Sequence, residues 1–140
     1  MKNKILIALV FFSTTLFLKC DNVDFTVDCA ECYQEEPLWG DIYVQLTIND
    51  ENNFVPLVIY RGDFENNDIE YVDTAFEEEY YIDVPLNKYY AVKAEYLVGS
   101  DTIYAIDGDE IKTKLNTEDC DQECYVIKGG NFDVRLKNFN

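Results

Sequence analysis

The sequence contains no histidine, and Ser100 is the only serine after residue 19. The absence of histidine excludes Ser-His-Asp and Cys-His catalysis, histidine-ligated zinc, and acid–base chemistry by histidine near neutral pH. Ser100 falls in a predicted tight turn. Paired carboxylates remain available for glycosidase chemistry, but no pair is singled out. We therefore expect a protein that is not an enzyme and carries no cofactor.

Basic residues are also few. The chain has 11 Lys and Arg against 28 Asp and Glu, and a formal net charge of −17. Lys2, Lys4 and Lys19 precede Cys20, whereas every acidic residue follows it. Such an acidic surface repels nucleic acid and anionic lipid headgroups at close range. The sequence predicts no nucleic-acid partner and no direct binding of the folded part to a membrane.

The first 19 residues have the pattern of a signal peptide. A basic start is followed by the apolar run from Ile5 to Leu18, which is shorter than the roughly 20 residues of a membrane span. The run ends in Leu18-Lys19-Cys20, which resembles the lipobox of bacterial lipoproteins. The acidic stretch that follows resembles the tether of some Gram-negative lipoproteins. The resemblance implies that Cys20 is acylated, for example with palmitate, and anchors the protein in the cell envelope at the outer membrane, facing either the periplasm or the exterior.

The five cysteines form an odd set, which in an exported protein requires another use for one of them. With Cys20 assigned to the lipid, Cys29, Cys32, Cys120 and Cys124 remain. Structural disulfides, a four-cysteine zinc site and a redox dithiol are the alternatives. Acidic residues surround all four sulfurs, which raises thiol pKa values and opposes a tetrathiolate metal centre.

We therefore expect structural disulfides, for which three pairings are possible. A bridge between the two ends of the chain would close a loop of about 90 residues and stabilise the fold by about 4–5 kcal/mol. We favour these long-range pairings over the two local ones. Residues 20–37 are then an acidic tether carrying the first cysteine pair, and residues 38–140 form the folded domain.

Alternation of apolar and polar residues dominates the domain and predicts an all-β fold, since no segment after the signal peptide has helical periodicity. The expected strands lie at 42–48, 55–61, 69–75, 80–84, 89–98, 101–106, 125–127 and 132–136. Turn signals recur every 8 to 12 residues, which is typical of a β-sandwich. We expect a single antiparallel β-sandwich of about seven strands.

The clearest local signal is a hairpin around Gly99-Ser100. Glycine at the first central position of a two-residue loop suits a type II′ turn, because glycine adopts positive φ without steric cost. Counting outward pairs Tyr96 with Ile103 and Ala94 with Ala105 on the drier face, which we expect to point inward. After this hairpin, Asp107-Gly108-Asp109 is predicted to end the strand in a turn.

The stretch Tyr90-Ala91-Val92-Lys93-Ala94-Glu95-Tyr96 resembles the Tyr-x-Val-x-Ala-x-Tyr strand of prealbumin-like and carboxypeptidase-regulatory-like sandwich domains. Val55-Pro56-Leu57-Val58-Ile59, followed by Gly62, is similar to their second strand. The resemblance implies a non-catalytic module.

Aromatic residues are abundant, with 11 Tyr, 9 Phe and one Trp. Tyr43 and Tyr104 are expected to point away from the core, and Trp39 to lie at a strand start; exposed aromatics of this kind stack on sugars or a protein partner. Asp107, Asp109 and Glu110 are candidate calcium ligands in the predicted turn.

The sequence thus predicts a lipid-anchored, non-enzymatic binding or accessory module of the cell envelope, with a membrane, a glycan or another envelope protein as partner. The alternative is a thiol-redox or metal-binding envelope lipoprotein that uses the four cysteines.

Overall fold

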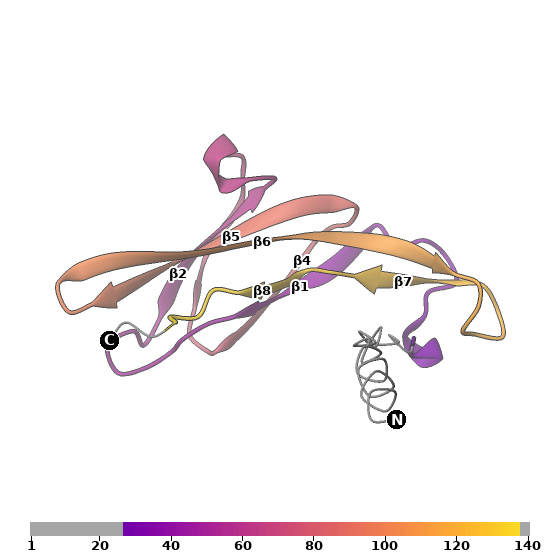
Figure 1. Cartoon of the computed structure of the whole chain (residues 1–140), viewed down its shortest axis with the longest axis horizontal. Helices are drawn as coiled ribbons and strands as arrows, with labels where there is room; N and C mark the ends of the chain where they lie inside the picture. The colour runs from indigo at the N-terminus through magenta and orange to yellow at the C-terminus, as the bar shows by residue number, and fades with distance from the viewer. Residues whose placement is uncertain (1–26, 138–140) are drawn as a thin grey trace, which may run out of the picture.

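The computed structural model describes residues 27–137 and shows a β-sandwich of two sheets (Figure 1). The predicted signal peptide, the lipidation site Cys20 and the first part of the predicted tether lie outside these residues. Within residues 27–137, no helix is both long and apolar enough to cross a membrane. The predicted all-β class is confirmed.

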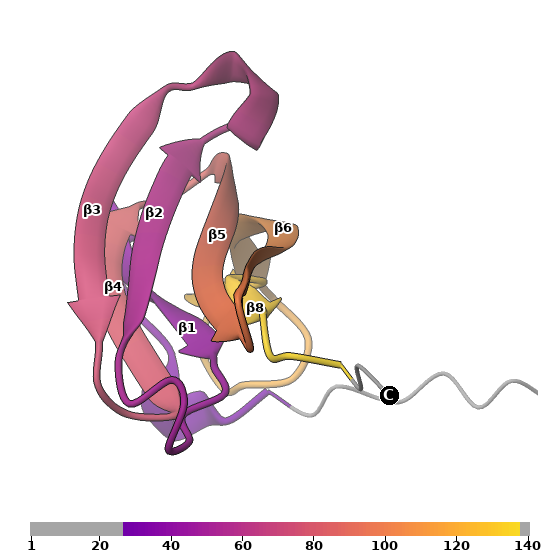
Figure 2. The same ribbon diagram turned by 90° about the vertical axis from the view of Figure 1, so that its left-hand side faces the viewer.

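Eight strands make up the two sheets. They are β1 (Trp39–Gln45), β2 (Val55–Arg61), β3 (Ile69–Ala75), β4 (Glu79–Pro85), β5 (Lys88–Val98), β6 (Asp101–Asn116), β7 (Cys124–Lys128) and β8 (Asn131–Asp133). Two short 3-10 turns, η1 (Cys29–Glu31) and η2 (Phe64–Asn66), interrupt the loops. The three-stranded sheet has the order β4-β1-β8, and the five-stranded sheet the order β3-β2-β5-β6-β7. Figure 2 shows β3, β2, β5 and β6 side by side, with β1 and β4 behind them.

The core lies between the sheets and is built by the alternation seen in the sequence. Ile42 and Val44 of β1 face Leu57, Val92 and other apolar side chains of the larger sheet, and all are fully buried. Each such side chain contributes roughly 1.5–3 kcal/mol when it leaves water. The outward residues between them therefore remain available for function.

Tyr96 fixes the two sheets relative to each other. Its ring is fully buried, and its hydroxyl donates to the Val134 carbonyl at 2.9 Å while accepting from the Thr47 amide at 3.2 Å. A buried hydroxyl needs such partners, because an unsatisfied polar group costs about 1–3 kcal/mol. One tyrosine thus joins β5 to the segments that follow β1 and β8.

The β5–β6 hairpin confirms the predicted register. Tyr96 pairs with Ile103 and Ala94 with Ala105, and Gly99 has the positive φ of 63° that the turn requires. Tyr96 and Ala94 are fully buried, so the face predicted to point inward does so.

The turn predicted at Asp107-Gly108-Asp109 is wrong, because β6 continues without interruption to Asn116. The ring of Tyr89 lies over Gly108, where it occupies the space that a side chain would fill. An aromatic ring that covers a glycine offsets the poor strand propensity of that position. Packing from the neighbouring strand therefore overrides the local turn signal.

The last strand also departs from the expected antiparallel arrangement. Residues Asn131–Asp133 pair with Tyr43–Gln45 in parallel, whereas every other strand pair is antiparallel. Gly129 and Gly130 both have positive φ, 79° and 78°, and turn the chain from β7 into β8. Left-handed backbone of this kind is accessible to glycine at little cost. The strand then places Phe132 in the core.

Candidate functional site

The outer face of the three-stranded sheet carries two of the three aromatic residues predicted to bind a ligand. In β1 every second residue is buried, so Trp39, Asp41 and Tyr43 point to solvent. Trp39 is 52% exposed, which is unusual for the only tryptophan of the chain. Trp39 and Tyr43 therefore lie on one surface, as expected from their strand parity.

The structure adds Tyr81 to this surface. Tyr81 of β4 pairs with Tyr43 across the two strands, and their ring centroids lie 5.0 Å apart with an interplanar angle of 31°. Tyr81 is 58% exposed. We call Trp39, Tyr43 and Tyr81 the aromatic strip. Aromatic pairs at this distance hold each other in place, so the two rings form a pre-arranged surface.

Hydrogen bonds fix the two tyrosines further. The Glu79 carboxylate accepts from the Tyr43 hydroxyl at 3.0 Å and from the Tyr81 hydroxyl at 3.3 Å. The Gln45 side-chain amide donates to the Tyr43 hydroxyl at 3.1 Å. Partial loss of hydration and the negative charge of Glu79 both raise the pKa of Tyr81. The Tyr81 hydroxyl therefore stays protonated at neutral pH and keeps donating to Glu79.

Carboxylates alternate with the rings along the strip. Asp41 and Asp83 face each other across β1 and β4, between Trp39 at one end and the tyrosine pair at the other. Like charges directly opposite one another weaken a strand pair. Asp41 and Asp83 therefore present two neighbouring carboxylates at the middle of this surface.

The far end of the strip carries a positive group. The Arg135 guanidinium donates to both Asp133 oxygens, at 2.7 and 3.0 Å. These hydrogen bonds from Arg135 are the main reason why the pKa of the Asp133 carboxyl lies well below its usual range. The charged pair is held in a fixed orientation beside Gln45, which is the strand neighbour of Asp133.

Tyr104, the third predicted aromatic, belongs to a different surface. It lies in β6 on the outer face of the five-stranded sheet and is 54% exposed. Strand parity correctly predicts that Tyr104 points outward. Parity does not show to which sheet a strand belongs, so it cannot place Tyr104 and Tyr43 on opposite sides of the sandwich. Tyr81 was missed for the same reason, because its place beside Tyr43 depends on the pairing of β1 with β4.

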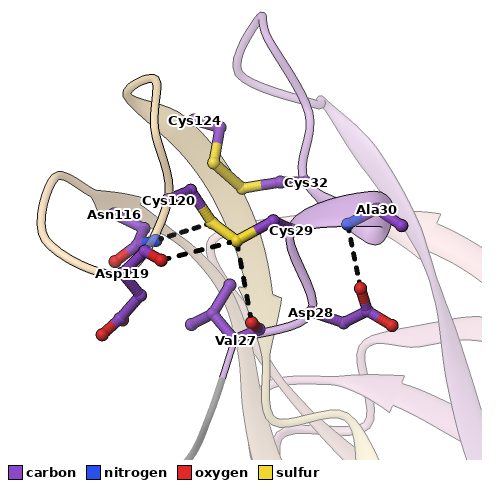
Figure 3. The surroundings of a disulfide bond; sticks show 9 residues. All are labelled: Val27, Asp28, Cys29, Ala30, Cys32, Asn116, Asp119, Cys120 and Cys124. Carbon is purple, nitrogen blue, oxygen red and sulfur yellow. Dashed lines mark hydrogen bonds between the residues drawn. A yellow bond between two sulfur atoms is a disulfide. The ribbon is translucent and has the colours of Figure 1, made fainter.

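The four remaining cysteines form two disulfides, Cys29–Cys120 and Cys32–Cys124, with Cα–Cα distances of 5.7 and 5.6 Å. This is one of the predicted long-range pairings. Figure 3 shows the two bridges next to each other; Cys29–Cys120 joins η1 to the loop before β7, and Cys32–Cys124 joins the residue after η1 to the first residue of β7. Tyr33 extends the connection through two backbone hydrogen bonds to Tyr125, at 2.9 and 2.7 Å. The bridges thus tie the start of the described chain to the end of β6 and to β7.

The sulfurs of Cys32, Cys120 and Cys124 lie within 4.8 Å of one another, which in reduced form would be close enough to share a metal ion. Their proximity follows from the adjacent bridges. Oxidised sulfurs offer no thiolate to a metal, because the thiolate is the ligand form. Within residues 27–137 the geometry is therefore that of a structural clamp, and the redox or metal-binding alternative stays an untested prediction.

The candidate calcium ligands lie in strand β6. Asp107 accepts a hydrogen bond from the Asp133 amide at 2.8 Å, and Asp109 accepts from the amides of Gly130 and Asn131 at 2.8 and 3.3 Å. Glu110 pairs with Lys112 at 2.5 Å. Asp107 and Asp109 thus join β6 to β8, because their carboxylates satisfy backbone amides at the strand edge. Calcium binding there stays an untested prediction.

Comparison with family models, with curated proteins and with solved structures found no match for this chain. The fold and the outer surfaces of its two sheets therefore carry the functional reasoning.

Proposed function

We propose that this protein is a non-catalytic β-sandwich module that binds a glycan along the aromatic strip. The observation that supports the proposal is the placement of Trp39, Tyr43 and Tyr81 on one outer face, with carboxylates between them. Tyr43 lies four positions beyond Trp39 in β1, a distance of about 13 Å. That span exceeds one sugar ring, so the ligand is an oligosaccharide lying along β1.

Each part of the strip matches one part of a sugar. Ring faces cover the apolar C–H face of a pyranose, and their burial supplies the favourable free energy. Carboxylates of Asp41, Asp83 and Glu79 accept hydrogen bonds from hydroxyl groups, and bonds to a charged acceptor contribute more than neutral ones. The local negative charge repels uronic acids and attracts amino sugars. The preferred ligand is therefore a neutral or amino-sugar glycan.

The arrangement suits binding rather than hydrolysis. A glycosidase holds the scissile bond between two carboxyl groups that approach it from different sides. Asp41 and Asp83 instead lie beside each other on one sheet surface. The proposal therefore contains no catalytic step.

The location of the module is a further part of the proposal. The lipobox-like sequence at Cys20 supports acylation and anchoring in the cell envelope at the outer membrane. Multiple acyl chains hold a protein stably where one chain does not. A glycan-binding module on such an anchor would keep an envelope polysaccharide or a glycosylated envelope protein close to the membrane.

The test uses the full-length protein with short oligosaccharides of glucose, N-acetylglucosamine and glucosamine, and with a uronic-acid oligosaccharide as the repelled control. Trp39 is the only tryptophan, so its fluorescence reports binding at the strip directly. Tyr81→Ala should weaken binding by at least about tenfold, which is the loss expected when an aromatic residue at the centre of a binding surface is truncated. Tyr104→Ala, which replaces a similarly exposed tyrosine on the other sheet, is the matched control and should leave glycan binding unchanged. Failure of every oligosaccharide to bind, or equal effects of the two substitutions, would refute the proposal.

A further inference from the structure

The outer face of the five-stranded sheet carries apolar residues where a solvated sheet face is normally polar. The strand register places Val72, Val58, Lys93 and Ile106 side by side in one row across β3, β2, β5 and β6. Val72 is 70% exposed and Ile106 41% exposed. Scattered exposed apolar residues are common, but three apolar residues that line up with one lysine across four strands are typical of an interaction surface.

The adjoining row of the same face is also apolar. It consists of Ile69, Tyr60, Ala91 and Gly108, one residue from each of the same four strands. Tyr60 and Ala91 are buried and Gly108 lies under the Tyr89 ring, so the exposed surface of this row comes from Ile69 and from Tyr89. On the other side of the first row, Glu95 of β5 pairs with Tyr104 of β6. We call these three rows the outer apolar face. Tyr104, exposed but separate from the aromatic strip, therefore belongs to a second candidate site.

The charges of this face differ from those of the whole molecule. Lys93 and Glu95, two residues apart on β5, are the charged members of the three rows. The Lys93 ammonium lies 5.8 Å from the ring centroid of Tyr60 and 5.2 Å from that of Tyr104, distances that suit cation–π contact. Within residues 27–137, neither Lys93 nor Glu95 forms an ion pair. The face is therefore electrically neutral in a chain of net charge −17.

We propose that the outer apolar face binds the same face of a second copy of this chain. A basic partner would be expected to select a part of the surface with concentrated negative charge, whereas a neutral face brings two acidic copies together with the least repulsion. Consider a twofold axis that lies in the interface, runs across the strands and passes between Lys93 and Glu95 of β5. This axis places Lys93 of each copy opposite Glu95 of the other. The same rotation places Ile106 opposite Tyr104 of the second copy. This reciprocal contact is the requirement of a twofold interface, and aligned sheet packing supplies a known geometry for it.

The size of the face limits the strength of the dimer. Four strands about 4.8 Å apart span about 15 Å, which gives an interface of the small, transient class below roughly 1,200 Å². Outside the face, the two copies repel each other through their net negative charge. Salt screens that repulsion, since the Debye length falls from about 10 Å at 0.1 M to about 3 Å at 1 M. Association of the two copies should therefore be weak at low salt and become tighter as salt is added. Binding to a basic partner would show the opposite salt dependence.

The experiment uses charge exchange at the two central residues. Full-length protein in non-ionic detergent is studied by sedimentation velocity over a range of concentrations, with two fluorescent labels for mixed samples. Lys93→Glu and Glu95→Lys should each weaken self-association by more than about tenfold, because each sets like charges against each other. An equimolar mixture of the two single variants should associate again, and so should the variant carrying both exchanges. Only a contact between Lys93 of one copy and Glu95 of another predicts both rescues.

A control separates the contact from general charge effects. Asp83→Lys makes the same change of charge as Glu95→Lys, but on the outer face of β4, and should not disrupt the dimer. Thermal unfolding of each variant checks that the fold is intact, since Lys93→Glu also removes the contacts with Tyr60 and Tyr104. A protein that stays monomeric at all salt concentrations, or single variants that fail to associate when mixed, would overturn the proposal. Neither result would bear on glycan binding, which is placed on the opposite sheet.

Discussion

The two disulfides should stabilise the fold by amounts that are far from additive. In the chain-entropy model, the bridge Cys29–Cys120, with a sequence separation of 91, closes a large loop of the unfolded chain. That closure is worth about 4.5 kcal/mol of unfolding free energy. Once it is in place, Cys32–Cys124 closes only the small ring between the two bridges, of roughly eight residues, which adds about 2.5 kcal/mol.

Either bridge can be the one that closes the large loop. Replacing Cys29 and Cys120 together by alanine should therefore cost only about 2.5 kcal/mol, and replacing Cys32 and Cys124 should cost about the same. Replacing all four should cost about 7 kcal/mol, well above the sum of the two pairs. The excess over the sum of the two pairs, about 2 kcal/mol, is a measurable part of the total stability of about 5–15 kcal/mol that is usual for a domain.

Urea unfolding of the full-length protein, followed by far-UV circular dichroism, measures these three losses. The large-loop interpretation fails if each pair alone costs about 4.5 kcal/mol, because the bridges would then act on separate loops. It also fails if the variant lacking all four cysteines unfolds at the same urea concentration as the native protein. The segment from η1 to Tyr33 would then detach without unfolding the sandwich, and the bridges would secure only a peripheral strand contact.

Three further predictions concern single residues. Tyr96→Phe should lower the unfolding free energy by about 1–3 kcal/mol in chemical denaturation, because the Val134 carbonyl and the Thr47 amide lose a buried partner. Burial raises the pKa of Tyr90 to about 12, so the folded state keeps this hydroxyl protonated when the unfolded chain already ionises. The contribution of Tyr90 to the unfolding free energy is present below about pH 10 and is lost between pH 10 and pH 12. In thermal unfolding over that pH range, the stability of Tyr90→Phe should therefore fall less steeply than that of the native protein. Full-length protein should incorporate a clickable palmitate analogue during expression, and Cys20→Ser should abolish the label; labelling that persists would contradict acylation at Cys20.

The central hairpin shows which parts of the fold the sequence predicts well. Its register follows from one turn and from the alternation on either side of it, and both are local properties. Tyr96 and Ala94 are buried because they lie on the face of β5 that packs in the core, and their partners Ile103 and Ala105 in β6 share that face. The long-range disulfides were predicted for a different reason, since loop closure favours bridges that join distant parts of the chain.

Features that depend on contact between distant segments were missed. The Asp107-Gly108-Asp109 sequence has every local property of a turn, yet Tyr89 covers the glycine and the two carboxylates bind amides near β8. No pattern near β8 indicates that it pairs in parallel with β1. Because Gly129-Gly130 only marks a change of direction, the sequence cannot specify where the new strand docks.

The difference between local patterns and contacts of distant segments also explains why the sequence predicted the exposed residues of the candidate site but not their grouping. It also explains why the two outer surfaces have different roles in our proposals. Parity shows that Trp39, Tyr43 and Tyr104 are exposed, but grouping them requires knowledge of which strands are neighbours. Once the sheets are separated, each outer face departs from an ordinary solvated sheet in its own way. The smaller sheet combines aromatic rings with unpaired acids facing each other, which suits a ligand rich in hydroxyl groups. On the larger sheet, the outer apolar face combines apolar residues with one cation and one anion, which suits binding to the same face of a second copy. A glycan and a second copy could therefore bind at the same time, because the full thickness of the core separates the two faces.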